Sequence, residues 1–148
     1  MSTRVIQDIL DAKLATVANI PQIIGENLAT ERTQDTQNSI YQTPYCRTKL
    51  LPAQTDTFSL GASGHDRWYG LYQITLFFPA NDGTDGPNYA ADQIINAFDP
   101  SVFLTDTGSP ASDIVVRVAQ TPWREIAFEN TQWFQLPVTV QYEAYIQR

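Results

Sequence analysis

The chain has 148 residues with 9 Lys and Arg against 16 Asp and Glu, a formal net charge of −7, and we expect a single domain over residues 1–148 because a chain of this length can bury a core without staples. Its acids are scattered and its basic residues form no run, which argues against tight binding of nucleic acid or of an anionic membrane. One cysteine permits no intrachain disulfide, and no stretch has the apolar length of a signal core or a membrane span.

The first part of the chain predicts a helix and then little regular structure. Residues 2–19 carry one apolar stripe at helical spacing, made of Val5, Ile6, Ile9, Leu10, Leu14 and Val17. A short extended segment is expected at residues 23–27. Residues 29–43 are polar, with almost nothing to bury, and predict a long loop.

The middle of the chain predicts two strands joined by another long loop. Residues 45–51 lie between Pro44 and Pro52 and form the first of these strands, and residues 69–78 form the second, because their even positions are apolar and Gln73 and Thr75 are polar. Residues 53–67 are mostly polar, apart from Phe58 and Leu60. Loops of this length between neighbouring strands usually bind something, so residues 53–67 are the best interaction candidate.

The remaining elements are a helix and two strands. Residues 87–98 predict a helix with Pro87 in its first turn, a loop is expected at 99–112, and strands are expected at 113–119 and 134–146. Pro137 cannot donate to a strand ladder, which predicts that the last strand is an edge or carries a bulge. The order indicates an α+β domain with a mixed or antiparallel sheet of about five strands and two helices on one face.

The glycine-rich turn at residues 81–86 invites two binding hypotheses. A phosphate loop is disfavoured because the turn lacks a Gly-Lys-Ser/Thr ending and has Asp82 and Asp85 where phosphate would sit. A calcium loop of EF-hand spacing is disfavoured because Gly83 offers no ligand and Asp92 closes the loop in place of a bidentate Glu. An ordinary acidic surface turn is the favoured interpretation.

The sequence has few residues suited to catalysis or to metal binding. His65 is the single histidine, and pairing it with Cys46 as a nucleophile would bring together a strand residue and a loop residue without an evident third orienting group. Zinc needs several His or Cys ligands. We therefore expect no enzyme, no cofactor and no metal site.

Binding to other proteins is the function class that remains, and arginine and tryptophan are enriched at the hot spots of protein interfaces. Arg67, Trp68 and Tyr69 form either a recognition patch or a strand start whose tryptophan caps the core, and for Trp123 and Trp133 core packing is the favoured alternative. The residues predicted to contact a partner or another subunit are Phe58, Leu60, Arg67, Trp68, Trp123 and Arg124.

Taken in order, these features resemble the tail-terminator proteins of long-tailed bacteriophages. The matching marks are the N-terminal amphipathic helix, residues 24–27, the strand from Pro44 to Pro52, the segment from Arg67 to Pro79 with its glycine turn, the helix at 90–98, and the closing strand at 133–142 with Leu136-Pro137-Val138. The likeness covers nearly the whole chain, although the connection at 29–43 is longer than the family pattern.

The resemblance implies a structural virion protein, assembled in the host cytoplasm and located in the neck region of the tail. Such a protein forms a ring, usually a hexamer, on the last ring of tail tube protein, stops polymerisation and presents a surface to the head completion or connector protein. DNA would pass through the pore without specific binding, and no membrane is involved. A head-tail connector or stopper protein, and a small-molecule-binding or enzymatic α+β domain, are the alternatives.

Overall fold

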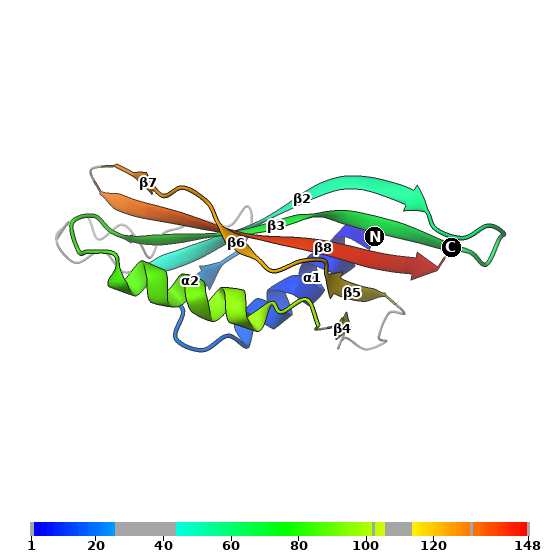
Figure 1. Ribbon diagram of the computed structural model, residues 1–148, viewed down its shortest axis with the longest axis horizontal. Coiled ribbons are helices and arrows are strands. Elements are labelled where there is room, and N and C mark those ends of the chain that lie inside the picture. Colours follow the sequence, from blue (N-terminus) through cyan, green and yellow to red (C-terminus); the bar gives the residue numbers. More distant parts are fainter. Residues whose placement is uncertain (1, 26–43, 102, 106–113, 131, 148) are drawn as a thin grey trace.

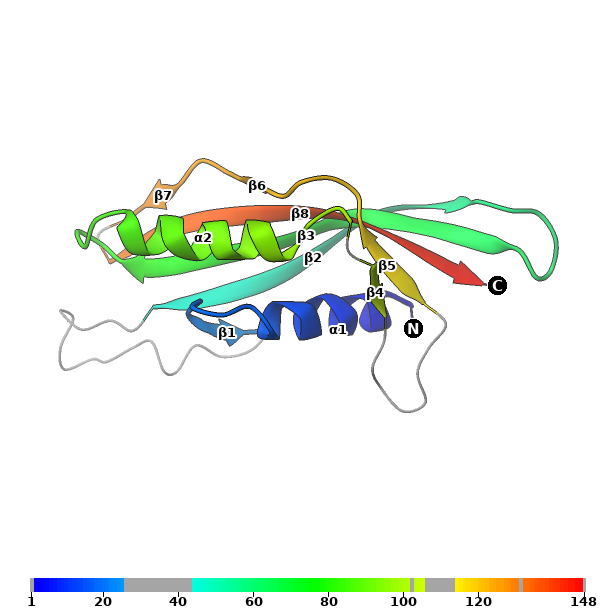
Figure 2. The ribbon, with the colours of Figure 1, turned by 60° about the horizontal axis from the view of Figure 1, so that its bottom comes forward.

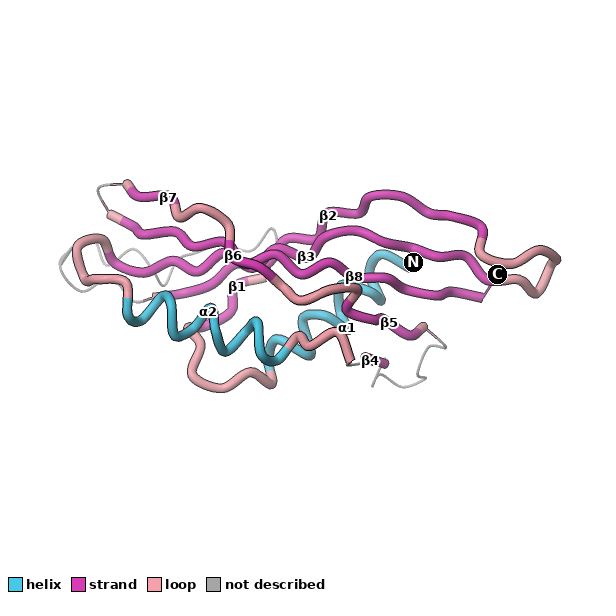
Figure 3. The backbone as a smooth tube through the Cα atoms, viewed as in Figure 1, coloured by secondary structure: helices cyan, strands magenta, loops and turns pink. Residues whose placement is uncertain are grey.

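The computed structural model describes residues 2–25, 44–101, 103–105, 114–130 and 132–147. The elements in chain order are α1 (Ser2–Ala15), β1 (Gln22–Ile24), β2 (Tyr45–Thr57), β3 (His65–Pro79), α2 (Asp85–Ala97), β4 (Phe103–Thr105), β5 (Val115–Val118), β6 (Trp123–Arg124), β7 (Phe128–Glu129) and β8 (Trp133–Gln147). The molecule is elongated, because the long strands β2, β3 and β8 run along its long axis (Figures 1 and 3).

The strands form one sheet in the order β1-β2-β3-β8-β5-β4, with β6 and β7 pairing with β8 beside this path. Only the β1–β2 pair is parallel among the described strands. The sheet curls into a half-barrel, and both helices lie on its concave face (Figure 2). Within the described ranges, no helix lies on the other face of the sheet (Figure 2).

The prediction of about five strands is wrong, although the chain is α+β: the described residues form a sheet of eight strands. The three strands that the sequence did not indicate are β4, β6 and β7, which are only two or three residues long. Such segments are too short for an alternating pattern to appear. They owe their extended conformation to pairing with β5 or β8.

The predicted loop at residues 53–67 is also wrong, because β2 and β3 continue through most of it as a hairpin. Thr57 pairs with Asp66 and Asp56 with Arg67, which leaves only residues 58–64 to connect the strands. This outer part of β2 is polar because it is mostly exposed, so backbone pairing, which the side-chain pattern does not reveal, holds it in place. The predicted loop at 99–112 contains β4, and its residues 102 and 106–112 lie outside the described residues, as does the predicted loop at 29–43.

Pro137 does not mark an edge strand or a bulge, because β8 is interior and its ladder with β3 runs through Pro137 without a register shift. The carbonyl oxygen of Pro137 accepts a hydrogen bond from the backbone N–H of Glu125 at 2.9 Å. The nitrogen and carbonyl of one residue point to the same side of an antiparallel strand, so the missing N–H faces the short strand β6. A proline does lie on a free edge in β2: β1 pairs only with residues 45–47 of this strand, and a register shift lies between Pro52 and Gln54.

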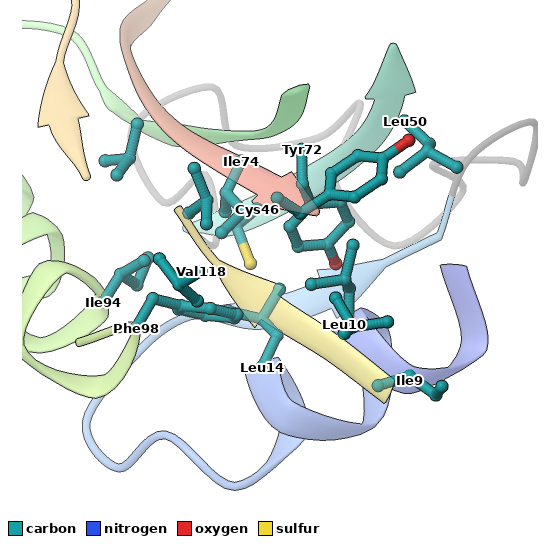
Figure 4. Close-up of a cluster of buried hydrophobic side chains, with 14 of the residues drawn as sticks. Ile9, Leu10, Leu14, Cys46, Leu50, Tyr72, Ile74, Ile94, Phe98 and Val118 are labelled. Atoms are coloured by element: carbon teal, nitrogen blue, oxygen red, sulfur yellow. The ribbon is translucent and has the colours of Figure 1, made fainter. Parts of the chain in front are cut away.

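The core lies between the concave face of the sheet and the two helices. Side chains from α1, α2, β2, β3 and β5 converge on one cluster, whose labelled members are Ile9, Leu10, Leu14, Cys46, Leu50, Tyr72, Ile74, Ile94, Phe98 and Val118 (Figure 4). Tyr72, Ile74 and Leu76 of β3 are completely buried, as their alternation predicts. This packing fixes the middle of β3 and β8, and the β2–β3 hairpin projects beyond the helices at one end of the molecule (Figure 2).

Candidate interaction surfaces

The tip of the β2–β3 hairpin, residues 58–64, is an ordered turn with apolar side chains in solvent. The backbone N–H groups of Phe58 and Ser59 both donate to the carbonyl of His65, at 2.9 and 3.1 Å, and the N–H of His65 donates to the hydroxyl of Ser59 at 2.7 Å. Leu60 is 92% exposed and Phe58 62% exposed. The Phe58 ring rests edge-on against Tyr145, with 5.2 Å between ring centroids, so the tip offers a preordered apolar surface.

Arg67 lies in the stem of this hairpin, and its charge is already compensated. Its guanidinium donates to the carboxylate of Asp56 at 3.1 Å and lies over the ring of Tyr69, 5.3 Å from the centroid. The hydrogen bond with Asp56 raises the pKa of Arg67. By the alternation of β3 these groups lie on the sheet face without helices, where Arg117 also pairs with Glu143 at 3.9 Å.

Trp68 points to the other face of the sheet. It pairs across the sheet with Ala144, is partly buried, and packs against the margin of the core. Of the two interpretations offered by the sequence, this placement gives Trp68 a packing role within the subunit; its role toward a partner stays a prediction.

Trp123 and Arg124 form β6, well away from the hairpin tip. The indole N–H of Trp123 donates to the carboxylate of Glu125 at 2.8 Å, and Arg124 donates to the side-chain oxygen of Asn88 in α2 at 2.9 Å. Trp123 pairs with Thr139, whereas Arg67 pairs with Tyr145, and these partners are about 20 Å apart along β8 at the usual rise per residue. The six residues predicted from sequence therefore form two separate groups.

The end of the molecule opposite the hairpin carries a second exposed apolar group that the sequence reasoning missed. Ile126, between β6 and β7, is 94% exposed, and Phe128, the first residue of β7, is 60% exposed. The available signal was two large apolar residues in a stretch without strand or helix periodicity. Both ends of the elongated molecule therefore present apolar side chains to solvent.

A hollow of about 320 Å³ lies at the same end as β7. It is lined by the turn between β3 and α2 and by the β7–β8 connection, through Ala80, Asn81, Gly83, Thr84, Glu129, Asn130 and Phe134. Phe134 supplies an apolar wall, and most of the other side chains are polar. Among the described residues, the nearby acids Asp82 and Asp85 take part in no ion pair, so this end carries negative charge.

Chemical sites are sparse in the part of the chain that the structure describes. No three His, Cys, Asp or Glu side chains there gather closely enough to hold a metal ion. No helix there has the length and apolar character to cross a membrane. Burial raises the pKa of the Cys46 thiol to about 12, which removes its nucleophilic form at neutral pH.

Comparisons with known proteins place the fold in a known group. A family model described as "Phage tail terminator protein" matches residues 5–142. Twelve solved chains match this structure, and one of them superimposes with a TM-score of 0.62 and 17% sequence identity, covering 96% of this chain and 92% of its own. At that identity the likeness shows the fold alone. None of the curated proteins matches the sequence.

Proposed function

Because the chain belongs to the phage tail terminator protein family, whose members are structural proteins of the phage tail and components of the virion, we propose that it forms a ring at the head-proximal end of the tail tube and stops the polymerisation of the tube. The observation that carries this proposal is the family match over residues 5–142. The ring is a hexamer that contacts the tube protein on one side and the head completion protein on the other, in the neck of the virion.

A ring of identical subunits requires each subunit to present two different surfaces, one for each neighbour. The elongated shape with exposed apolar side chains at both ends, Phe58 and Leu60 at one and Ile126 and Phe128 at the other, provides such surfaces. Single exposed apolar residues are common on protein surfaces, whereas contiguous ones typically mark contact sites, and each of these two groups consists of residues only two positions apart in the chain. The family and the surface chemistry therefore support the same assembly role, with no enzymatic step.

Passage of DNA through the ring requires that few cations are available to hold phosphates. Three arginines are close to carboxylates, with Arg4 beside Asp8, Arg67 beside Asp56 and Arg117 beside Glu143. Together with the net charge of −7, these pairs leave little basic surface. A pore built from such subunits lets DNA slide through without binding it.

Interrupting the gene and viewing the particles by electron microscopy tests the proposal. Loss of a terminator leaves tubes of uncontrolled length without heads. Loss of a connector or stopper, the other assembly role, leaves free tails of normal length and heads that leak DNA. Tails of normal length joined to heads would overturn both assignments, whereas restoration of normal length by the gene supplied in trans ties the effect to this protein.

A further inference from the structure

Building on the proposed ring, we infer that the hairpin tip of one subunit inserts into the hollow beside β7 of the next copy of this chain. The occupant of the hollow is thus the apolar tip formed by Phe58 and Leu60. These two surfaces hold the ring together.

The two surfaces lie at opposite ends of the long axis. The β2–β3 hairpin projects at one end, and β7 lies at the other, with the turn between β3 and α2 (Figure 1). The hairpin end projects beyond both helices (Figure 2), and the other end, where α2 begins, holds the hollow. Contacts between these ends join subunits head to tail, which is the arrangement that generates a ring when the rotation closes.

The shape and chemistry of the two ends are complementary. The hollow of about 320 Å³ falls at the lower end of the size range of pockets that enclose ligands, about 300–1,000 Å³, and so can admit a whole side chain. Leu60, at 92% exposed, is the most prominent apolar side chain of the tip. Phe134 offers it an apolar wall, and the polar side chains of Asn81 and Thr84 lie around it. An apolar anchor within a polar rim is the usual composition of a protein interface.

A contact between the tip of one copy and the hollow of the next is favoured over a symmetric contact between two tips. A contact between tips would bury Phe58 and Leu60 and leave Ile126 and Phe128 exposed in every pair. Insertion of the tip into the hollow instead uses one surface at each end of the subunit. It also repeats around a closed ring, whereas a symmetric contact ends at a dimer.

Disulfide cross-linking on purified tails, in which the cap is assembled, tests the inference. The pair Leu60→Cys and Thr84→Cys places one thiol at the tip and one in the hollow. The native Cys46 is completely buried and does not compete. We expect the double variant to give covalent multimers up to the full ring, a mixture of the two single variants to stop at dimers, and each single variant alone to give none. The control pairs Leu60→Cys with Asn96→Cys, an exposed position on α2, and should give no cross-link.

A second measurement does not depend on thiol geometry. Leu60→Ser should lower ring assembly by about tenfold or more, the effect of losing a central anchor, while the melting temperature of the subunit stays unchanged. Leu60→Met should restore assembly.

The outcomes separate this inference from the proposed function. Tails that terminate normally but cross-link through Leu60→Cys alone, through the control pair, or not at all would overturn the inference and leave the terminator role intact. If removal of the gene leaves tail length unchanged, the proposed function itself fails, and the inferred interface fails with it.

Discussion

The hydroxyl of Tyr72 donates a hydrogen bond to the carboxylate of Asp11, 61 positions away in the chain, and so joins the centre of β3 to α1. Tyr72 is completely buried. Burial, followed by the nearby negative charge of Asp11, raises the pKa of Tyr72. The contact holds the first helix against the sheet at the point where β3 is most buried.

Removal of this hydroxyl in Tyr72→Phe should lower the free energy of unfolding by about 1.5–3 kcal/mol, the usual contribution of a hydrogen bond to a charged group. Urea denaturation at pH 7 measures the change. Tyr69→Phe is the matched control, because the Tyr69 hydroxyl donates to Gln54 at 3.1 Å in an exposed setting and should cost less than about 1 kcal/mol. Equal losses in the two variants would show that the buried contact has no special role.

Gly70 should not tolerate even a methyl group. A Cβ at this position would press on the carbonyl of Leu51, lie 2.9 Å from the Tyr142 hydroxyl and lie 3.0 Å from the backbone nitrogen of Ala53. Because two of these contacts are backbone atoms of β2, the register shift beside Pro52 would have to move. We expect Gly70→Ala to lower the free energy of unfolding by about 1–3 kcal/mol, as overpacking usually does.

The control for that substitution is Gly86→Ala in the first turn of α2. Its Cβ would meet the ring of Phe78 at 3.2 Å, and a ring can shift more easily than a backbone. Alanine also favours a helix over glycine by about 1 kcal/mol. In thermal denaturation, the melting temperature of Gly86→Ala should be near or above that of the parent, and the melting temperature of Gly70→Ala should be clearly below it.

The stability of the fold should decrease at alkaline pH through Cys46. Its thiol is completely buried, and burial raises the pKa from 9.0 to about 12. Between these values the unfolded thiol ionises while the folded thiol keeps its proton, and this ionisation favours the unfolded state. The contribution of Cys46 to the free energy of unfolding is therefore intact below about pH 9 and is lost as the pH rises toward 12. The slope approaches about 1.4 kcal/mol per pH unit for one group.

Urea midpoints measured between pH 7 and pH 10 check this expectation. Cys46→Ala should be less stable at pH 7 because it leaves a cavity, yet should lose less further stability up to pH 10 than the parent does. Above that range the buried Tyr72 adds its own loss, since its pKa is also raised. A parent and a variant with the same pH profile would contradict the assignment to Cys46.

The long periodic segments were predictable from sequence, and the segments held by pairing alone were not. The alternation in β3 and β8 and the helical stripe of α2 reflect burial against a core, and burial dictates side-chain type. The outer part of β2 and the strands β6 and β7 bury little, so their sequence carries no pattern. The prediction from Pro137 was wrong because the effect of a proline depends on which neighbouring strand its nitrogen faces. That neighbour is set by the order of strands in the sheet.

The candidate surfaces were also predictable from sequence only in part. Phe58 and Leu60 were recognisable because large apolar residues interrupt a polar stretch. Ile126 and Phe128 were not singled out, because they lie in a short stretch without strand or helix periodicity. The hollow beside β7 combines residues 80–84 with residues 129–134, and only the folded chain brings these two turns together.

The final prediction separates packing from recognition within the hairpin. Trp68 packs against the core margin, so Trp68→Ala should lower the free energy of unfolding by about 1–3 kcal/mol. Leu60→Ser removes a side chain that contacts mainly solvent, and should change stability by less than about 0.5 kcal/mol. Urea denaturation of the isolated subunit measures both variants. A large loss of stability in Leu60→Ser would mean that the tip supports its own fold, and the surface would then no longer be available for a neighbour.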